Sequence, residues 1–316
     1  MIALEAVGLH KRYGERVALD GVSLSVARGE IVGLLGPNGA GKTTTLSILA
    51  TLIEADSGTV RAGDFSTQTG RAAMRRKLGF VPQAIALYPT LSARQNIELF
   101  ARVHGAPRRQ ASAAAASALE TVGLATRAHD PVSILSGGMK RRLNLACAMV
   151  HRPEILLLDE PTVGVDPQSR EQILATVRSA AESGTAVVYS THYMEEVERV
   201  CSRALLIDYG RVVAQGTVTE LIALGGRHPR MEIVFQIPPS AGWLANLEGA
   251  SELAHSNAGG ALELELASLA QVGEVIERVR HFGGRLTEFS VHSPNLSDAF
   301  IALTGHALRE DAAGGR

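Results

Sequence analysis

The sequence predicts an α/β domain that carries a helical insertion, followed by a small C-terminal α+β domain. The first 225 residues contain short apolar runs separated by helix-like patterns, which is typical of buried parallel strands joined by crossover helices. This rhythm stops between Leu91 and Val150, where helix formers dominate and no convincing strand is found. Turn-forming residues at 224–229 then separate a shorter region. A length of 316 residues, about twice that of a usual domain, agrees with two domains.

The composition is that of a folded protein without strong charge. Hydrophobic residues make up 46% of the chain and charged residues 20%, which excludes a disordered or fibrous protein. Lys and Arg number 31 against 32 Asp and Glu, so the net charge of -1 provides no basic field for nucleic acid. The longest uncharged stretch, residues 78–93, is too short to span a bilayer. Glu5 precedes any apolar core of signal-peptide length, so we expect no secretion signal. Cys147 and Cys201 form no CxxC pattern, and we expect buried, reduced thiols in a soluble cytoplasmic protein.

The α/β pattern can be assigned element by element. Five apolar runs are expected to form buried strands: Ile31–Leu35, Leu78–Pro82, Ile155–Asp159, Ala186–Ser190 and Ala204–Asp208. Helices are expected at Lys42–Leu52, Pro167–Glu182 and Met194–Cys201, and within the insertion at Gln110–Leu119.

The C-terminal region predicts three strands and two helices. Strands are expected at Met231–Ile237, Leu262–Leu266 and Arg285–Val291. Apolar residues from Leu269 to Val279 recur at helical spacing and predict an amphipathic helix, ended by Gly283-Gly284. We expect the last helix to open with Ser293 as its N-cap and Pro294 in its first turn, and the tail from Arg309 to be frayed.

A phosphate-binding loop is the strongest motif in the chain. The segment Gly36-Pro37-Asn38-Gly39-Ala40-Gly41-Lys42-Thr43 fits the pattern GxxxxGK[ST], between a predicted strand and a predicted helix. In such loops the glycines let backbone N–H groups turn toward the phosphates, the lysine reaches the β and γ oxygens, and the hydroxyl ligates Mg²⁺. The motif therefore predicts a nucleotide phosphate site.

Two acids end the predicted strand at 155–159. Ending a buried strand in Asp159-Glu160 is costly unless a cation or a reacting water uses these groups. Asp159 suits the role of holding Mg²⁺, and Glu160 points elsewhere and can polarise a water. Alone the pair also fits an ordinary turn at a strand end, whereas the phosphate loop upstream favours the catalytic interpretation.

Leu135-Ser136-Gly137-Gly138-Met139 precedes an apolar helix and resembles a second anion-binding helix N-terminus, although by itself it also fits a plain N-cap. Gln83 follows one predicted strand and His192 follows another. The order of these five motifs resembles the ATPase subunit of ATP-binding-cassette (ABC) transporters over residues 1 to about 220. The resemblance implies a P-loop NTPase core of ABC type over residues 1–225, with a helical subdomain at about 84–152 and an accessory domain at 229–316.

The resemblance implies roles for residues on the nucleotide side of the site. Tyr13 matches the aromatic residue that stacks on adenine, and Thr44 extends the loop that binds ATP. Thr43, Gln83 and Asp159 match the groups that approach Mg²⁺, so ATP and Mg²⁺ are the expected cofactors.

Other matches imply a site shared between two subunits. Ser136, Gly137 and Gly138 match the signature that closes on the γ-phosphate of ATP held by the other subunit. Asp166 matches the loop that crosses the dimer interface. Glu160 resembles the general base, and His192 matches the histidine that contacts the γ-phosphate.

The sequences of three segments, which begin at Leu135, Pro161 and Asn295, resemble those of bacterial drug-exporter ATPases of the daunorubicin-resistance type. This implies a homodimeric ATPase that energises efflux of a drug, lipid or polysaccharide through a separate permease, at the cytoplasmic face of the inner membrane. A soluble ABC ATPase of DNA repair or translation is the alternative. It is disfavoured because no long coiled coil separates Thr43 from Ser136 and the chain carries one cassette. An importer subunit remains a second alternative.

Overall fold

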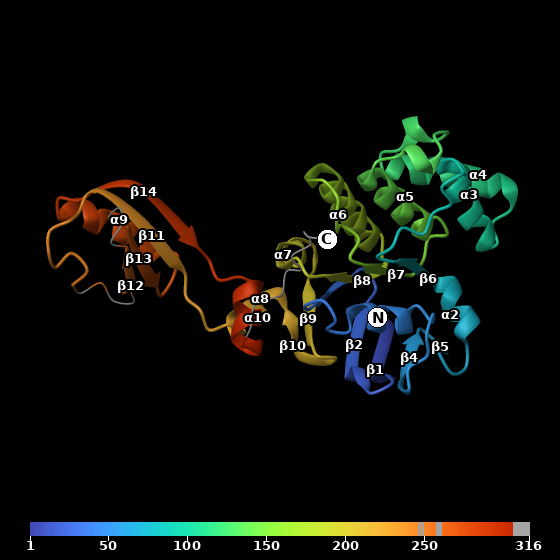
Figure 1. Cartoon of the computed structure of the whole chain (residues 1–316), viewed down its shortest axis with the longest axis horizontal. Helices are drawn as coiled ribbons and strands as arrows, with labels where there is room; N and C mark the ends of the chain where they lie inside the picture. The colour runs from blue at the N-terminus through green and yellow to red at the C-terminus, as the bar shows by residue number, and fades with distance from the viewer. Residues whose placement is uncertain (246, 248–249, 257–260, 306–316) are drawn as a thin grey trace. The chain divides into compact units, whose positions relative to one another are not determined.

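The computed structural model describes residues 1–245, 247, 250–256 and 261–305 of the chain. These residues form two compact units, Met1–Leu221 and Ile222–Gly305, and each is described by itself below (Figure 1). The boundary between them falls inside helix α8 (Val218–Leu224).

The centre of the first unit is a six-stranded sheet. Its order is β10-β9-β3-β8-β7-β6, with β10 antiparallel to β9 and the other strands parallel. The strands span Ile31–Leu35 (β3), Leu78–Val81 (β6), Ile155–Asp159 (β7), Ala186–Thr191 (β8), Arg203–Asp208 (β9) and Arg211–Thr217 (β10). All five strands expected from the apolar runs are confirmed. Every residue of β3, β7 and β8 is buried, which explains why these strands show no polar alternation.

Four helices adjoin the strands of this sheet along the chain: three follow β3, β7 and β8, and one precedes β6. They are α1 (Lys42–Leu49), α2 (Arg71–Lys77), α6 (Pro167–Glu182) and α7 (Met194–Val200). The expected helix at 42–52 ends three residues early, because Thr51 has a left-handed backbone with φ of 60° that an α-helix does not accept.

A second, antiparallel sheet was not predicted. Its order is β2-β1-β4-β5, with strands Ile2–Tyr13 (β1), Arg16–Ala27 (β2), Ser57–Ala62 (β4) and Phe65–Ser66 (β5). Apolar side chains of this sheet, such as Leu4 and Val22, share one core with Leu34 and Leu46 of the six-stranded sheet and α1. The β1–β2 hairpin places Tyr13 opposite Arg16.

The expected helical insertion is confirmed. It contains α3 (Ala93–Val103), α4 (Arg108–Thr121), two 3₁₀ turns (Ala125–Arg127 and Val132–Ile134) and α5 (Gly137–Met149). In this part of the described chain the only β pairing is a single bridge between Ser92 and Pro131. The helices share their own core, in which Ile97, Leu119 and Leu143 are buried.

The second unit is a four-stranded antiparallel sheet of order β12-β13-β11-β14, with one helix, α9, that shares its core. Its elements are β11 (Arg230–Ile237), β12 (Ala250–Ser256), β13 (Ala261–Leu266), α9 (Gln271–His281), β14 (Arg285–His292) and α10 (Leu296–Thr304). β12 was not expected from the sequence. The core of this second unit includes Met231, Leu264, Val275 and Val279.

The start of α10 corrects one prediction. Asn295, not Ser293, is the N-cap, and Pro294 lies before the helix. The Asn295 side chain accepts a hydrogen bond from the Asp298 N–H, and the Asp298 carboxylate accepts one from the Asn295 N–H. This reciprocal pair satisfies two backbone donors, which a serine two residues earlier cannot do. The turn-forming segment before β11 is also tied down, since Arg227 Nη1 lies 2.7 Å from Asp298 Oδ1. The tail from Arg309 lies outside the described residues.

Candidate active site

The predicted phosphate loop connects β3 to α1 and lies at the carboxyl end of the parallel strands. Lys42 is the first residue of α1 and is only 4% exposed. Its ammonium donates to the carbonyl oxygens of Gly36 at 2.7 Å and Pro37 at 3.2 Å. Burial lowers the pKa of Lys42, and the nearby Glu160 carboxylate partly opposes that shift. The loop thus folds around its own lysine.

Gly210, in the turn between β9 and β10, supports the phosphate loop from outside. Its N–H donates to Ala40 O at 2.9 Å, and its carbonyl accepts from Asp20 N at 2.8 Å. The residue has a φ of 77°, and a Cβ here would lie 2.6 Å from Ala18 O, so glycine is required on both counts. Gly210 was not predicted. The Tyr-Gly pair after an apolar strand indicates a turn, but not what the turn contacts.

Asp159 ends β7 beside the loop and is 1% exposed. Its Oδ1 accepts a hydrogen bond from Ser190 Oγ at 2.8 Å. Burial raises the pKa of Asp159, while hydrogen bonds from the Ser190 and Thr43 hydroxyls oppose the rise. The structure thus brings together two of the three predicted metal-site residues, Thr43 and Asp159.

Three side chains converge on the carboxylate of Glu160. Its Oε1 lies 3.3 Å from Lys42 Nζ and 3.3 Å from His192 Nδ1, and its Oε2 accepts from Gln83 Nε2 at 3.1 Å. Burial acts to raise the pKa of Glu160, but the hydrogen bond from His192 and the charge of Lys42 outweigh burial and lower it. Glu160 is therefore ionised at neutral pH.

The backbone of Glu160 is left-handed, with φ of 47°. This bend turns the chain away from β7 directly after Asp159, while the Glu160 N–H still donates to Ser190 O at 3.1 Å. A non-glycine residue in this region is uncommon, and such residues are enriched at functional sites.

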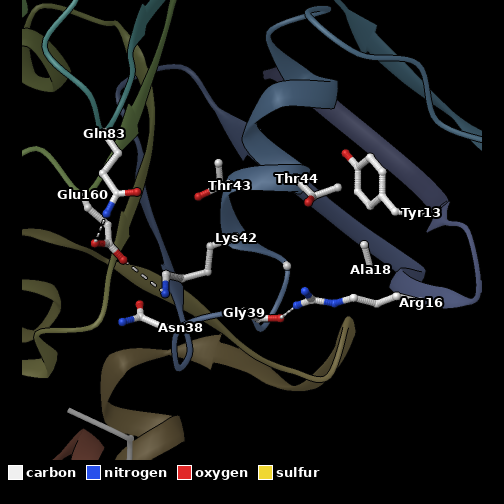
Figure 2. Close-up of a pocket in the computed structure, with 11 residues that line it drawn as sticks. Tyr13, Arg16, Ala18, Asn38, Gly39, Lys42, Thr43, Thr44, Gln83 and Glu160 are labelled. Atoms are coloured by element: carbon white, nitrogen blue, oxygen red, sulfur yellow. Dashed lines mark hydrogen bonds and ion pairs between the residues drawn. The ribbon is translucent and has the colours of Figure 1, made fainter. Parts of the chain in front are cut away.

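A pocket of about 390 Å³ runs along the loop (Figure 2). Lys42, Gln83 and Glu160 lie at one end, and Tyr13 lies at the other, next to Thr44 and Ala18. Tyr13 is 51% exposed, and Lys11 Nζ lies 5.7 Å from the centre of its ring. Asn38, Gly39, Gly41 and Thr43 complete the predicted part of the lining.

Arg16 and Ala18 of β2 also line this pocket, although they were not predicted. Arg16 Nη2 donates to Gly39 O at 3.4 Å, across the loop. No sequence motif marks these two residues, because they reach the pocket through the antiparallel sheet.

The remaining predicted residues form a separate cluster that does not line the pocket. Ser136 is the N-cap of α5, and its Oγ accepts from Met139 N at 3.3 Å. Asp166 is the N-cap of α6, its carboxylate accepts from Ser169 N at 2.8 Å, and this bond lowers the Asp166 pKa. The first turns of α5 and α6 lie against each other at Gly138, where a Cβ would lie only 2.2 Å from Ser169 Oγ.

Comparisons with known proteins agree with this geometry. A profile of the ABC transporter family matches residues 19–163. The linearmycin resistance ATP-binding protein LnrL of Bacillus subtilis (strain 168) is 43% identical over 316 residues, covering 97% of this chain and all of that protein. The chain belongs to the ATP-binding subunits of ABC transporters. Its relatives include the daunorubicin resistance ATP-binding protein DrrA3 of Streptomyces coeruleorubidus, 36% identical with 97% of both chains covered.

A solved ABC cassette has the same fold as the first unit. This dimeric cassette, in a post-hydrolysis state bound to ADP and Pi, has a TM-score of 0.62 and 29% identity, and the match covers 68% of this chain and 98% of that one. The predicted fold class and the ATP-hydrolysing activity of the family are thereby confirmed, and the relatives favour an exporter subunit over a soluble ABC ATPase. Among the described residues, none of the helices has the length and apolar character needed to cross a membrane.

Proposed function

We propose that the chain binds ATP with Mg²⁺ in the pocket of the first unit and hydrolyses it to drive export through a separate permease. The observation that carries this proposal is the convergence of Lys42, Gln83 and His192 on the Glu160 carboxylate, beside a phosphate loop. A purely structural carboxylate needs partners but not an open pocket in front of it.

The residues along the pocket match the parts of a nucleotide, from its base to its phosphates. Tyr13 is placed to stack on the base, and the N–H groups of the loop, with Lys42 and the Thr44 hydroxyl, to hold the phosphates. Thr43 and Asp159 are hard oxygen ligands that already share a hydrogen bond, and Gln83 supplies a third polar group nearby. Such a donor set fits Mg²⁺, which is normally held by one or two protein oxygens together with phosphates and waters. When bound, the ion would neutralise charge on the β and γ oxygens.

Glu160 is the group that takes the proton from the attacking water. Its lowered pKa keeps the carboxylate ionised, so it is available as an acceptor at neutral pH. Lys42 and His192 hold Oε1, and Gln83 holds Oε2, which fixes the carboxylate relative to the loop. The water loses its proton to Glu160 as its oxygen bonds to the γ-phosphorus, and the bond to the bridging oxygen of ADP breaks.

A second copy of the chain is proposed to complete the site. Ser136 and Gly137 are exposed at the N-terminus of α5, away from the pocket of their own chain. Helix N-termini with free N–H groups bind anions, so this cluster suits the γ-phosphate of ATP held by the partner. The dimeric state of the related cassette supports this arrangement.

We further propose that the homodimer works at the cytoplasmic face of the inner membrane with a separate permease. The names of LnrL and DrrA3, resistance proteins that match nearly the whole chain including its second unit, support export of an antibiotic-like compound.

The test is co-purification. A tagged full-length chain, solubilised from membranes with mild detergent, should bring down a polytopic membrane protein identified by mass spectrometry. ATP hydrolysis by that complex should depend on Lys42. Recovery of the chain with ribosomes or DNA, and without any membrane protein, would contradict the exporter assignment.

A further inference from the structure

Glu196, on α7, is a buried carboxylate that does not line the pocket and has no part in the hydrolysis proposed above. It is 3% exposed. Its Oε2 accepts hydrogen bonds from three hydroxyl groups: Tyr189 Oη at 2.9 Å, Thr162 Oγ1 at 2.9 Å and Thr191 Oγ1 at 3.1 Å. Three donors on one oxygen make an unusually complete acceptor site.

Two of these hydroxyls belong to the segments that carry the proposed catalytic pair. Thr162 lies two residues after Glu160, in the bend that leaves β7. Thr191 ends β8 and directly precedes His192. The Thr191 hydroxyl also accepts from Tyr193 N at 2.9 Å, so it binds the backbone on the far side of His192. Glu196 thereby connects both segments.

The negative charge of Glu196 is balanced within the same region. Arg170 of α6 places its Nε 3.5 Å from Glu196 Oε1, and its guanidinium lies 5.1 Å from the centre of the Tyr193 ring. A buried carboxylate is costly, and apolar residues often replace buried ion pairs without loss of stability. Simple filling of this space therefore does not require a charged group.

We propose that Glu196 is a positioning residue that holds Glu160 and His192 at their 3.3 Å separation. The proposal rests on the proposed function, since it acts through Glu160 and His192. Glu196 touches neither of them: it fixes the backbone beside each by accepting from the Thr162 and Thr191 hydroxyls. A catalytic group displaced by about 1 Å loses about a hundredfold in rate, so hydrogen bonds of this kind are able to control turnover.

The variant Glu196→Gln keeps the size of the side chain but removes its charge. A neutral amide oxygen is a weaker acceptor than a carboxylate oxygen, so the bonds from the three hydroxyls weaken. With that oxygen toward the hydroxyls, the NH₂ group faces the guanidinium of Arg170, a donor against a donor. We expect kcat for ATP to fall about tenfold in the full-length dimer, with the KM for ATP within twofold, because the phosphate loop is untouched. Glu195→Gln is the matched control: Glu195 is the exposed neighbour on the same helix, and its variant should match the parent.

A double variant separates positioning from general loosening of the fold. In a His192→Ala background, Glu196→Gln should lower kcat by about threefold or less, because one of the two positioned groups is already gone. A merely structural defect would multiply, giving the full tenfold again, and that result would overturn the proposal. Thermal unfolding of each variant, followed by circular dichroism, should stay within a few degrees of the parent.

Glu160→Gln, measured alongside, distinguishes the proposal from the function on which it rests. If Glu160→Gln hydrolyses ATP at the parental rate, the assignment of Glu160 is wrong and the positioning role falls with it. If Glu160→Gln is inactive while Glu196→Gln retains parental kcat, the positioning role alone is wrong.

Discussion

Replacing Glu160 with glutamine isolates the proton-accepting role of this carboxylate. The amide keeps the size of the side chain, and its oxygen can still face Lys42 and His192, both of which lie 3.3 Å from Oε1. Gln83 donates to the other oxygen at 3.1 Å and can rotate its own amide to accept from the new NH₂ group. The local packing is therefore retained, and basicity is what the variant loses.

The expected loss follows from that chemistry. General-base catalysis contributes about 10² to 10⁴ in rate. Glu160→Gln should therefore lower kcat by this factor, about 2.7 to 5.4 kcal/mol in activation free energy. ATP binding should persist, because Lys42, Thr43 and the loop N–H groups remain. With MgATP the variant should run by light scattering as a dimer, at twice the 33.4 kDa of one chain, and with ADP as a monomer. The parent should show little dimer in either nucleotide, since it consumes the ligand that joins the two chains.

Phosphate release measured at saturating ATP decides the matter. Turnover of Glu160→Gln at the parental rate would refute the base assignment. Hydrolysis that fails without any ATP-dependent dimer would leave the base in place and refute the two-chain site formed with Ser136 and Gly138. The Glu195→Gln variant serves as the control for a carboxylate lost at the surface.

Three further outcomes follow from other features. Lys42→Ala should weaken ATP binding by about 2–5 kcal/mol, or about 30- to 5000-fold in Kd by calorimetry, because a buried cation that faces the phosphates is lost; near-parental affinity would contradict the site. A fragment of residues 1–225 should stay folded and bind ATP, because the first unit has its own cores; an insoluble fragment would show that the two units depend on each other. Burial, together with His104 stacked at 3.6 Å, lowers the pKa of His151 from 6.5 to about 4, so the unfolded chain takes up this proton first as pH falls. The contribution of His151 to the free energy of unfolding should be full above pH 6.5 and be lost toward pH 4. Because His151 is partly exposed, we expect a loss of about 1 kcal/mol between pH 7 and 5. Urea unfolding of His151→Gln should show a smaller decline over the same range.

Much of the site could be predicted because its residues follow buried parallel strands. Asp159 ends β7, His192 directly follows β8, and the loop that carries Lys42 follows β3. The carboxyl ends of these three strands meet at one edge of the sheet. A residue that follows such a strand in the sequence is therefore predicted to lie at this edge of the sheet. Five of the six strands of this sheet were recognisable for the same reason, since burial leaves uninterrupted apolar runs.

The unpredicted parts depend on contacts between distant segments. β1 and β2 escape recognition because their pairing shifts register at several points, for example between Ala6 and Leu9, which disrupts a two-residue alternation. Arg16 reaches the pocket only through that sheet, and Gly210 reaches the loop only through the β9–β10 turn. No local pattern records such partners. The prediction of Ser293 as the N-cap of α10 was wrong for a different reason. Ser293 and Asn295 both fit a helix start, and the reciprocal hydrogen bonds of Asn295 with Asp298 favour Asn295.

The contacts of Gly210 have a consequence for the order of events during synthesis. The phosphate loop occupies residues 36–43, but its supports come from much later in the chain. β3 lies between β8 and β9 in the sheet, and Ala40 O accepts a hydrogen bond from the N–H of Gly210, 170 positions later. A nascent chain that has emerged only as far as Glu160 contains all eleven residues that line the pocket but none of these supports. Because long-range contacts form only after their loops are closed, the nucleotide site is completed late, when β9 and β10 leave the ribosome. Until then β3 does not yet have both of its neighbours in the sheet, β8 and β9.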